Sequence, residues 1–174
     1  MGDRARSTAR ALAVMVAVVA LDQAVKAIVN GTLALGESVA VFPGLDIVNV
    51  RNRGVAFGMF ADGGALLVVL TAVALIALLA FFLTHSGRPL VWLPVGLLLG
   101  GAAGNLIDRA RQGSVTDYID PVLWPAFNVA DIAITLGVLS LLYVLEGAPA
   151  RREREQRLRG AGPRTPVAGP RDDA

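Results

Sequence analysis

Acidic and amide side chains collect in one stretch of the chain, residues 100–131. They are Asn105, Asp108, Asp117, Asp120, Asn128 and Asp131. Several of them lie inside or beside segments apolar enough to sit in lipid, where ionisable groups are costly and therefore mark functional sites. Two carboxylates can activate a water molecule: the ionised one takes a proton from the water, and the protonated one donates a hydrogen bond to the attacked carbonyl. The stretch therefore predicts hydrolysis by a pair of aspartates.

The composition excludes most other hydrolytic chemistries. The chain has no Cys and a single His, His85. Thiol nucleophiles, Cys-ligated zinc and multi-His metal sites are therefore excluded, and no Ser nucleophile motif accompanies His85. The chemistry that remains requires no metal and no cofactor.

The neighbours of each carboxylate indicate which two form the pair. Asp131 is in the first turn of an apolar helix, where the helix dipole favours an anion, and Asn128 is a suitable N-cap three residues earlier. Asp117 lies among apolar residues, which raise a carboxyl pKa as a catalytic acid requires. We expect Asp117 and Asp131 to be the pair. The alternative for Asn128 and Asp131 is ordinary helix capping.

Two further carboxylates suit structural roles better. Asp108 ends a helix, where a carboxylate is disfavoured, and it stands next to Arg109, which suits an ion pair. Asp120 precedes Pro121, as is typical of a turn. Asp108 is kept as the alternative partner in the pair.

The chain as a whole has the composition of a membrane protein. Its 174 residues are 55% hydrophobic and 17% charged, with a mean hydropathy of +0.60, whereas soluble chains are about 45–50% apolar and about 25% charged. We predict one all-α membrane domain over residues 1–146, with a Pro-, Gly- and Arg-rich cytoplasmic tail over 147–174 that is disordered. The four predicted transmembrane helices cover about 9–30, 64–84, 90–109 and 128–145.

The first apolar segment could also be a signal peptide, since basic residues precede it and a weak cleavage site ends at Ala20. We prefer a retained span, because the helix pattern continues to Asn30 and three more spans follow. Asp22 and Lys26 lie one helical turn apart near its end and can pair. They form either an ion pair at a helix end, reaching toward water, or a polar wall of the active site.

Between the first two spans, VAVFPGLDIVNV predicts two short strands around a Pro43-Gly44 turn, a small extracytoplasmic β-hairpin platform. In the third span Gly96, Gly100 and Gly104 repeat every four residues, which allows close helix packing. Residues 111–127 are predicted to be a loop.

Arginines decide the orientation, because cytoplasmic loops carry the excess of basic residues. One side would hold Arg4, Arg6, Arg10, Arg88 and the five arginines of residues 151–159, and the other Arg51, Arg53, Arg109 and Arg111. Both termini are therefore expected in the cytoplasm. The platform and the acidic loop then meet at the outer face.

At these residues the chain closely resembles the lipoprotein signal peptidase (signal peptidase II) family. The matching segments are DQAVK at 22–26, NRGVAFG at 52–58, GNLIDR at 104–109, VTDYID at 115–120 and FNVAD at 127–131. Val55 departs from the alanine usual in the family, and the part of the chain after Leu145 is not covered.

The resemblance implies a four-span aspartic endopeptidase of the bacterial cytoplasmic membrane. It would remove signal peptides from prolipoproteins just before the diacylglyceryl-modified Cys, with Asp117 and Asp131 as the catalytic dyad. Residues matching positions that line or brace that site are Asp22, Lys26, Asn52, Gly54, Asn105, Asp108, Arg109 and Asn128. Its expected partners are lipid-modified prolipoproteins and membrane lipid, not nucleic acid, and we expect a monomer.

Two other functions would also use some of these residues. A small transporter could use Asp22 and Lys26 in ion coupling, but the sequence shows neither internal repeats nor broken spans. A structural membrane protein could use the glycine repeat for assembly, and it would tolerate Asp117→Asn.

Overall fold

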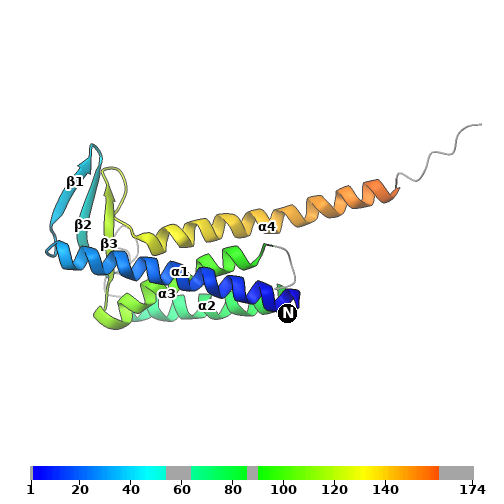
Figure 1. The fold of residues 1–174 in the computed structure, drawn as a ribbon, viewed down its shortest axis with the longest axis horizontal. Coiled ribbons are helices and arrows are strands. Elements are labelled where there is room, and N and C mark those ends of the chain that lie inside the picture. Colours follow the sequence, from blue (N-terminus) through cyan, green and yellow to red (C-terminus); the bar gives the residue numbers. More distant parts are fainter. Residues whose placement is uncertain (1, 54–63, 86–89, 161–174) are drawn as a thin grey trace, which may run out of the picture.

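The computed structural model describes residues 2–53, 64–85 and 90–160, which form a helical bundle with a small sheet at one end (Figure 1). The helices are α1 (Asp3–Thr32), α2 (Gly64–His85), α3 (Trp92–Gln112) and α4 (Val129–Gly160). The strands are β1 (Ser38–Phe42), β2 (Leu45–Asn52) and β3 (Val115–Pro121). The four helices follow the predicted order.

The helix at the end of the chain differs from the prediction. The sequence predicts a disordered tail from residue 147 onward, but residues 147–160 continue α4 as one helix to Gly160. Arg, Glu, Gln and Leu dominate this stretch, and all four are good helix formers. Once α4 has been nucleated by packing, extending it costs little. The overall composition of this tail indicates disorder, but the helix propensity of these residues favours an extension of α4. Residues 161–174 lie outside the described part of the chain.

Apolar segments long enough to cross a membrane are present among the described helices. Asp3–Thr32 and Val129–Glu146 are long and apolar enough to cross a bilayer, and α2 contains a shorter apolar segment, Val69–Thr84. The predicted third span, 90–109, does not meet the same criterion, because polar residues occupy the last turns of α3. Large apolar side chains such as Val16 of α1 and Ile76 of α2 are nonetheless exposed on the outer faces of their helices, as lipid contact would require.

Glycines let α3 approach its neighbours closely. A Cβ atom on Gly96 would lie 2.7 Å from Ala11 O, and one on Gly100 would lie 2.8 Å from Val18 Cβ. The predicted glycine repeat therefore packs against α1. Gly101, one residue beyond Gly100, faces the backbone of α4 in the same way. The end of α3 is held between α1 and α4 at backbone distance, so its side chains must reach both helices.

The sheet is antiparallel with the order β1-β2-β3. The two strands predicted around the Pro43-Gly44 turn are present and pair with each other. The third strand, β3, lies where the sequence predicts a loop. It pairs with β2, and Asp117 of β3 is opposite Val50 of β2. Residues 115–119 are rich in types that favour strands, but their partner strand is over 60 residues away. That distance hid the pairing from local sequence patterns.

One buried apolar cluster and most of the buried polar groups lie at opposite ends of the bundle. Ala11, Phe82, Val91 and Val95 form a buried apolar cluster near the beginning of α1. The sheet lies at the other end of α1, beside the beginning of α4 (Figure 1). The buried charged and amide side chains gather there, beneath the sheet.

Candidate active site

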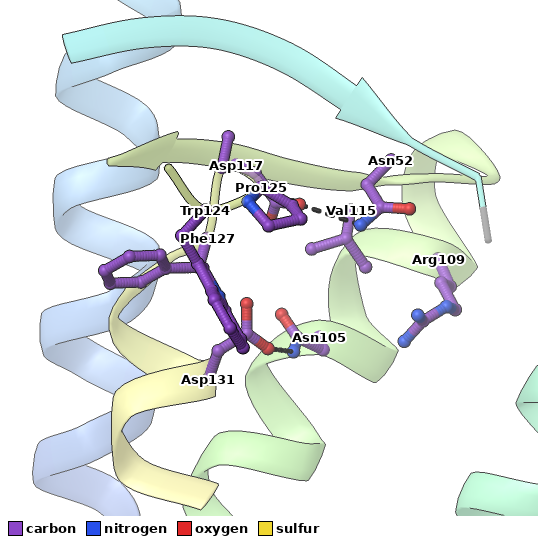
Figure 2. Close-up of a pocket in the computed structure, with 10 residues that line it drawn as sticks. Asn52, Asn105, Arg109, Val115, Asp117, Trp124, Pro125, Phe127 and Asp131 are labelled. Atoms are coloured by element: carbon purple, nitrogen blue, oxygen red, sulfur yellow. Dashed lines mark hydrogen bonds between the residues drawn. The ribbon is translucent and has the colours of Figure 1, made fainter. Parts of the chain in front are cut away.

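A cavity of about 280 Å³ lies where the sheet meets α3 and α4. Its walls are formed by Asn52, Asn105, Arg109, Val115, Asp117, Trp124, Pro125, Ala126, Phe127 and Asp131 (Figure 2). The structure therefore brings Asp117, from strand β3, and Asp131, from the first turn of α4, to the same pocket. The residues between them pass around its rim.

Asp117 is held by two amide donors. Its carboxylate accepts hydrogen bonds from Asn52 Nδ2 at 2.9 Å and from Asn128 Nδ2 at 2.7 Å. The residue is only 2% exposed, and burial raises its pKa from 3.8 to about 6. The nearby Asp131 carboxylate also raises this pKa, whereas the two amides and Lys26 lower it. A carboxyl group with such a pKa can exchange a proton near neutral pH.

The Asp131 carboxylate forms hydrogen bonds with the N-terminus of its own helix, α4, and with a side chain of α3. The Asn128 backbone N–H donates to Asp131 Oδ2 at 3.2 Å, and the Asp131 N–H donates to Asn128 Oδ1 at 3.0 Å. This is a reciprocal capping arrangement. The other carboxylate oxygen accepts a hydrogen bond from Asn105 Nδ2 at 2.8 Å. Capping and a place on the pocket wall are therefore combined in one side chain.

Asn128 links the surroundings of the two carboxylates. It is completely buried, and its Nδ2 lies 2.7 Å from Asp117 Oδ1 and 3.2 Å from Asn105 Oδ1. The amide group of Asn105 in turn contacts Asp131. Because both carboxylates depend on this pair of amides, a shift of either amide would alter both sides of the pocket.

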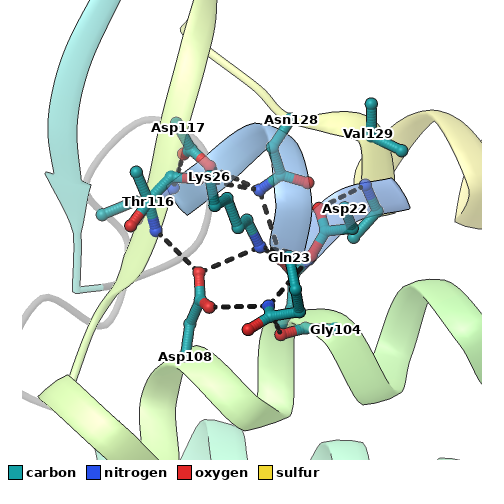
Figure 3. Close-up of polar contacts among 12 residues, drawn as sticks. Asp22, Gln23, Lys26, Gly104, Asp108, Thr116, Asp117, Asn128 and Val129 are labelled. Carbon is teal, nitrogen blue, oxygen red and sulfur yellow. Dashed lines mark hydrogen bonds and ion pairs between the residues drawn. The ribbon is translucent and has the colours of Figure 1, made fainter. Parts of the chain in front are cut away.

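A buried ionic cluster supports the amides from below (Figure 3). Lys26 Nζ lies 2.9 Å from Asp22 Oδ2 and 2.9 Å from Asp108 Oδ2, and it donates to Asn105 Oδ1 at 3.1 Å. All four side chains are buried. Buried charges are tolerated only when they are paired and hydrogen-bonded, and this cluster meets both conditions.

The two acids of the cluster also tie separate elements together. Asp22 Oδ1 accepts the Ala130 backbone N–H of α4 at 3.0 Å, and Asp108 Oδ2 accepts the Thr116 backbone N–H of β3 at 3.1 Å. Helix α1 therefore helps to position both elements that carry the pocket aspartates: it contacts α4 directly through Asp22, and it contacts β3 through Lys26 and Asp108.

Several predictions about this cluster need correction. Asp22 and Lys26 do pair, but both are buried, so the interpretation as an ion pair reaching toward water is wrong. Asp108 does form an ion pair, but with Lys26 and not with its neighbour Arg109, which lines the pocket instead. A side chain one position along a helix points in a different direction, whereas α1 packs directly against the face that carries Asp108.

Two predicted positions remain. Asp120, expected to form a turn, lies in β3 opposite Asp46. Gly54, matched to a family position from the sequence, lies outside the described residues. Asp108 does not line the pocket, and all its described contacts are structural.

Some contributors to the site were missed from the sequence. Gln23 Nε2 donates to Asp108 Oδ1 at 3.0 Å and to Gly104 O at 3.3 Å. Tyr118 Oη accepts the Val129 N–H at 3.1 Å, and burial raises its pKa to about 12, so the hydroxyl stays neutral. Gln23 lies inside the motif DQAVK and Tyr118 inside VTDYID, so membership of a family motif could have indicated both residues. Trp124 offered no such signal.

Comparison with known proteins agrees with this arrangement. The family model for signal peptidase (SPase) II matches residues 14–146. The lipoprotein signal peptidase of Halothermothrix orenii is 39% identical over 133 residues, covering 76% of this chain and 92% of that protein. The lipoprotein signal peptidase of Moorella thermoacetica is 42% identical over 130 residues, covering 74% and 87% of the two chains.

The fold is likewise shared with a solved structure. A bacterial membrane enzyme determined by the in meso method at 2.3 Å resolution superposes with a TM-score of 0.75 at 34% identity, covering 81% of this chain and 90% of that one. Together with the apolar helices, this similarity indicates an integral bacterial membrane protein. The family match covers the DQAVK segment, the sheet and both aspartate-bearing segments, and the chain belongs to the signal peptidase II family.

Proposed function

We propose that this protein is a membrane aspartic endopeptidase that removes signal peptides from bacterial prolipoproteins, cleaving before the diacylglyceryl-modified Cys of the lipobox. One observation carries the proposal: Asp117 and Asp131 line one pocket, and each accepts a side-chain hydrogen bond from a buried asparagine. Family membership supports the substrate class. The pair of carboxylates supports the catalytic type.

The surroundings of the two carboxylates suit different roles. Asp131 accepts hydrogen bonds at a helix N-terminus, where the helix dipole stabilises an anion. Asp117 is buried and its pKa is raised to about 6, which favours the protonated form. We assign Asp131 as the base and Asp117 as the acid, with the two titrating as a coupled pair.

The reaction then follows in two steps. Asp131 takes a proton from water as the water oxygen bonds to the scissile carbonyl carbon, and Asp117 gives its proton to the carbonyl oxygen. In the second step Asp131 gives its proton to the leaving nitrogen while the C–N bond breaks. Asp117 recovers a proton from the hydroxyl as the new carboxyl group forms. Both side chains return to their starting states, and one water molecule is consumed.

The proposed function includes an orientation of the protein in the membrane. All four helices span the bacterial cytoplasmic membrane, both termini lie in the cytoplasm, and the pocket lies near the outer face. Arginine distribution supports this orientation, and so does the gathering of polar groups at the sheet end of the bundle. There water can reach the carboxylates while a lipid-anchored substrate enters from the side. We expect a monomer to be sufficient, because both aspartates come from one chain.

The test is cleavage of a lipid-modified prolipoprotein by the purified wild type, Asp117→Asn, Asp131→Asn and Asp108→Asn, with folding of each checked by thermal denaturation. Turnover should fall by about 1000-fold or more in the first two variants, since each loses one partner of the acid–base pair. Measurable turnover in Asp108→Asn would agree with a bracing role. Normal turnover in Asp117→Asn would contradict the dyad, and an inactive wild type would contradict the function.

A further inference from the structure

An apolar tip lies at the rim of the pocket and has no role in the chemistry above. We define the tip as Val122, Leu123 and Trp124, the first residues after β3. Leu123 is 94% exposed and Trp124 is 62% exposed. Residues 121–127, PVLWPAF, contain no charged side chain. A soluble protein rarely leaves such a group of large apolar side chains in water.

The tip is held in place by the backbone. The Val122 N–H donates to Gly44 O of the β1–β2 turn at 3.2 Å, and the Trp124 N–H donates to Pro121 O at 3.1 Å. Phe127, on the far side, exchanges two backbone hydrogen bonds of 2.9 Å with Ile119. The apolar side chains are therefore presented outward by an ordered segment, which is what a binding surface requires.

The tip is continuous with both the pocket and the lipid-facing surface. Trp124 lines the same pocket as Asp117 and Asp131 (Figure 2). Five residues after Trp124 the chain enters α4, whose residues 129–146 are apolar enough to cross a bilayer. The tip therefore lies beside the pocket that holds the two carboxylates and a few residues before a helix apolar enough to enter a bilayer.

We propose that the apolar tip binds the acyl chains of the substrate's own diacylglyceryl group and so selects lipid-modified substrates. This inference rests on the proposed function. The modified Cys directly follows the scissile bond, and one residue spans at most about 3.6 Å. The lipid arm must therefore leave the pocket along its wall, and Trp124 supplies an uncharged wall that leads to Leu123.

The first experiment compares two synthetic lipobox peptides that carry long or short acyl chains on the Cys. In Leu123→Ser the KM for the long-chain peptide should rise about tenfold, the size expected when one leucine side chain loses its apolar contact. The kcat should stay within about twofold, and the short-chain peptide should be almost unaffected. The control is Leu35→Ser, because Leu35 is similarly exposed (67%) in the α1–β1 connection and does not line the pocket.

Several outcomes would overturn the proposal. An equal loss for long-chain and short-chain peptides would mean that the tip contacts bulk membrane lipid. A loss that depends on enzyme concentration would mean that a second copy covers the tip. An equal effect of Leu35→Ser would remove any special role of Leu123.

A binding measurement separates this proposal from the catalytic one. Trp92 and Trp124 are the two tryptophans of the chain, so Trp92→Phe combined with Asp117→Asn gives an inactive protein with Trp124 as its single reporter. The long-chain peptide should shift Trp124 emission to the blue, and the short-chain peptide should not. Unchanged emission would contradict the tip proposal. If the wild type cleaves neither peptide, the proposed function fails, and this titration still decides the role of the tip.

Discussion

The side-chain N–H of Asn105 donates a hydrogen bond to Asp131 Oδ1 at 2.8 Å. The orientation of this amide group is set by Lys26, which contacts the amide oxygen. Lys26 Nζ can only donate hydrogen bonds, and it lies 3.1 Å from Asn105 Oδ1. The oxygen of Asn105 must therefore face Lys26 and its nitrogen must face Asp131. A lysine that does not line the pocket thereby determines which hydrogen bond one of the pocket aspartates receives.

Asn105→Asp is expected to reduce kcat by about 100-fold, because a second carboxylate would replace the donor beside Asp131 and disturb its protonation. The fold should survive, since the new carboxylate can still accept hydrogen bonds from Lys26 and Asn128. Cleavage assays with a lipid-modified substrate, together with thermal denaturation, measure both effects.

The matched control is Asn30→Asp. Asn30 is exposed at the end of α1 and accepts a hydrogen bond from Arg51 at 3.2 Å, so the same added charge should leave activity unchanged. Equal activity of Asn105→Asp and wild type would mean that the donor to Asp131 has no part in the reaction.

Local pattern predicted the helices and the pocket aspartates better than it predicted their partners. The four helices were expected because apolar runs of this length have one structural solution in lipid. Asp117 and Asp131 were singled out because their apolar and helix-terminal neighbours are visible within a few residues. Both now line one pocket, although their catalytic roles stay a prediction.

The errors concern contacts between distant segments. Asp108 was paired with the adjacent Arg109, whereas its partner Lys26 lies 82 positions away on another helix. The sequence predicts a loop where strand β3 lies, because the hydrogen-bonding partner of this strand is β2, and two helices separate the two strands in the sequence. Such pairings depend on how α3 and the sheet close on α1, and no window of adjacent residues contains that information.

The pH dependence of cleavage should reflect Asp117. If Asp117 must be protonated to act as the acid, kcat/KM should fall as the pH rises through about 6, the pKa of this carboxyl group. The hydrogen bond from Asn52 stabilises the carboxylate and lowers that pKa. Asn52→Leu removes the donor, so the basic limb should move to higher pH.

The comparison for this measurement is Asn30→Leu, the same substitution at an exposed amide on α1. Its pH profile should match that of the wild type. A basic limb in Asn52→Leu that stays in place, or that moves to lower pH, would assign the titration to a different group.

Asp117 should also make stability depend on pH. Its folded-state pKa of about 6 is above the unfolded value of 3.8, so the stability associated with the protonated group is present at low pH and is lost as pH rises through about 6. Between pH 5 and pH 8 the wild type should lose on the order of 1 kcal/mol relative to Asp117→Asn. Thermal denaturation of both proteins across this range tests the difference, and a constant offset between them would show that Asp117 does not titrate there.

The glycines of α3 should matter in proportion to what they face. A Cβ atom on Gly104 would lie 2.6 Å from Asp22 Oδ2, so Gly104→Ala must displace a carboxylate that pairs with Lys26 and holds the Ala130 N–H. A Cβ atom on Gly100 would meet Val18 and the Met15 carbonyl oxygen. Both variants should lose about 1–3 kcal/mol of stability from overpacking. Only Gly104→Ala should also lose activity well below its melting temperature, because it moves the ionic cluster beneath Asn105.

Gly31→Ala is the control for these glycine variants. Gly31 also lies in a helix, near the end of α1, but a Cβ atom there would meet nothing within 4 Å. Alanine should therefore be neutral, or more stable by about 0.5–1 kcal/mol because it costs less backbone entropy in a helix. Denaturation midpoints and turnover of the three variants can be compared directly. If Gly104→Ala and Gly100→Ala lost activity equally at matched stability, the link from α3 packing through Asp22 to the pocket would be refuted.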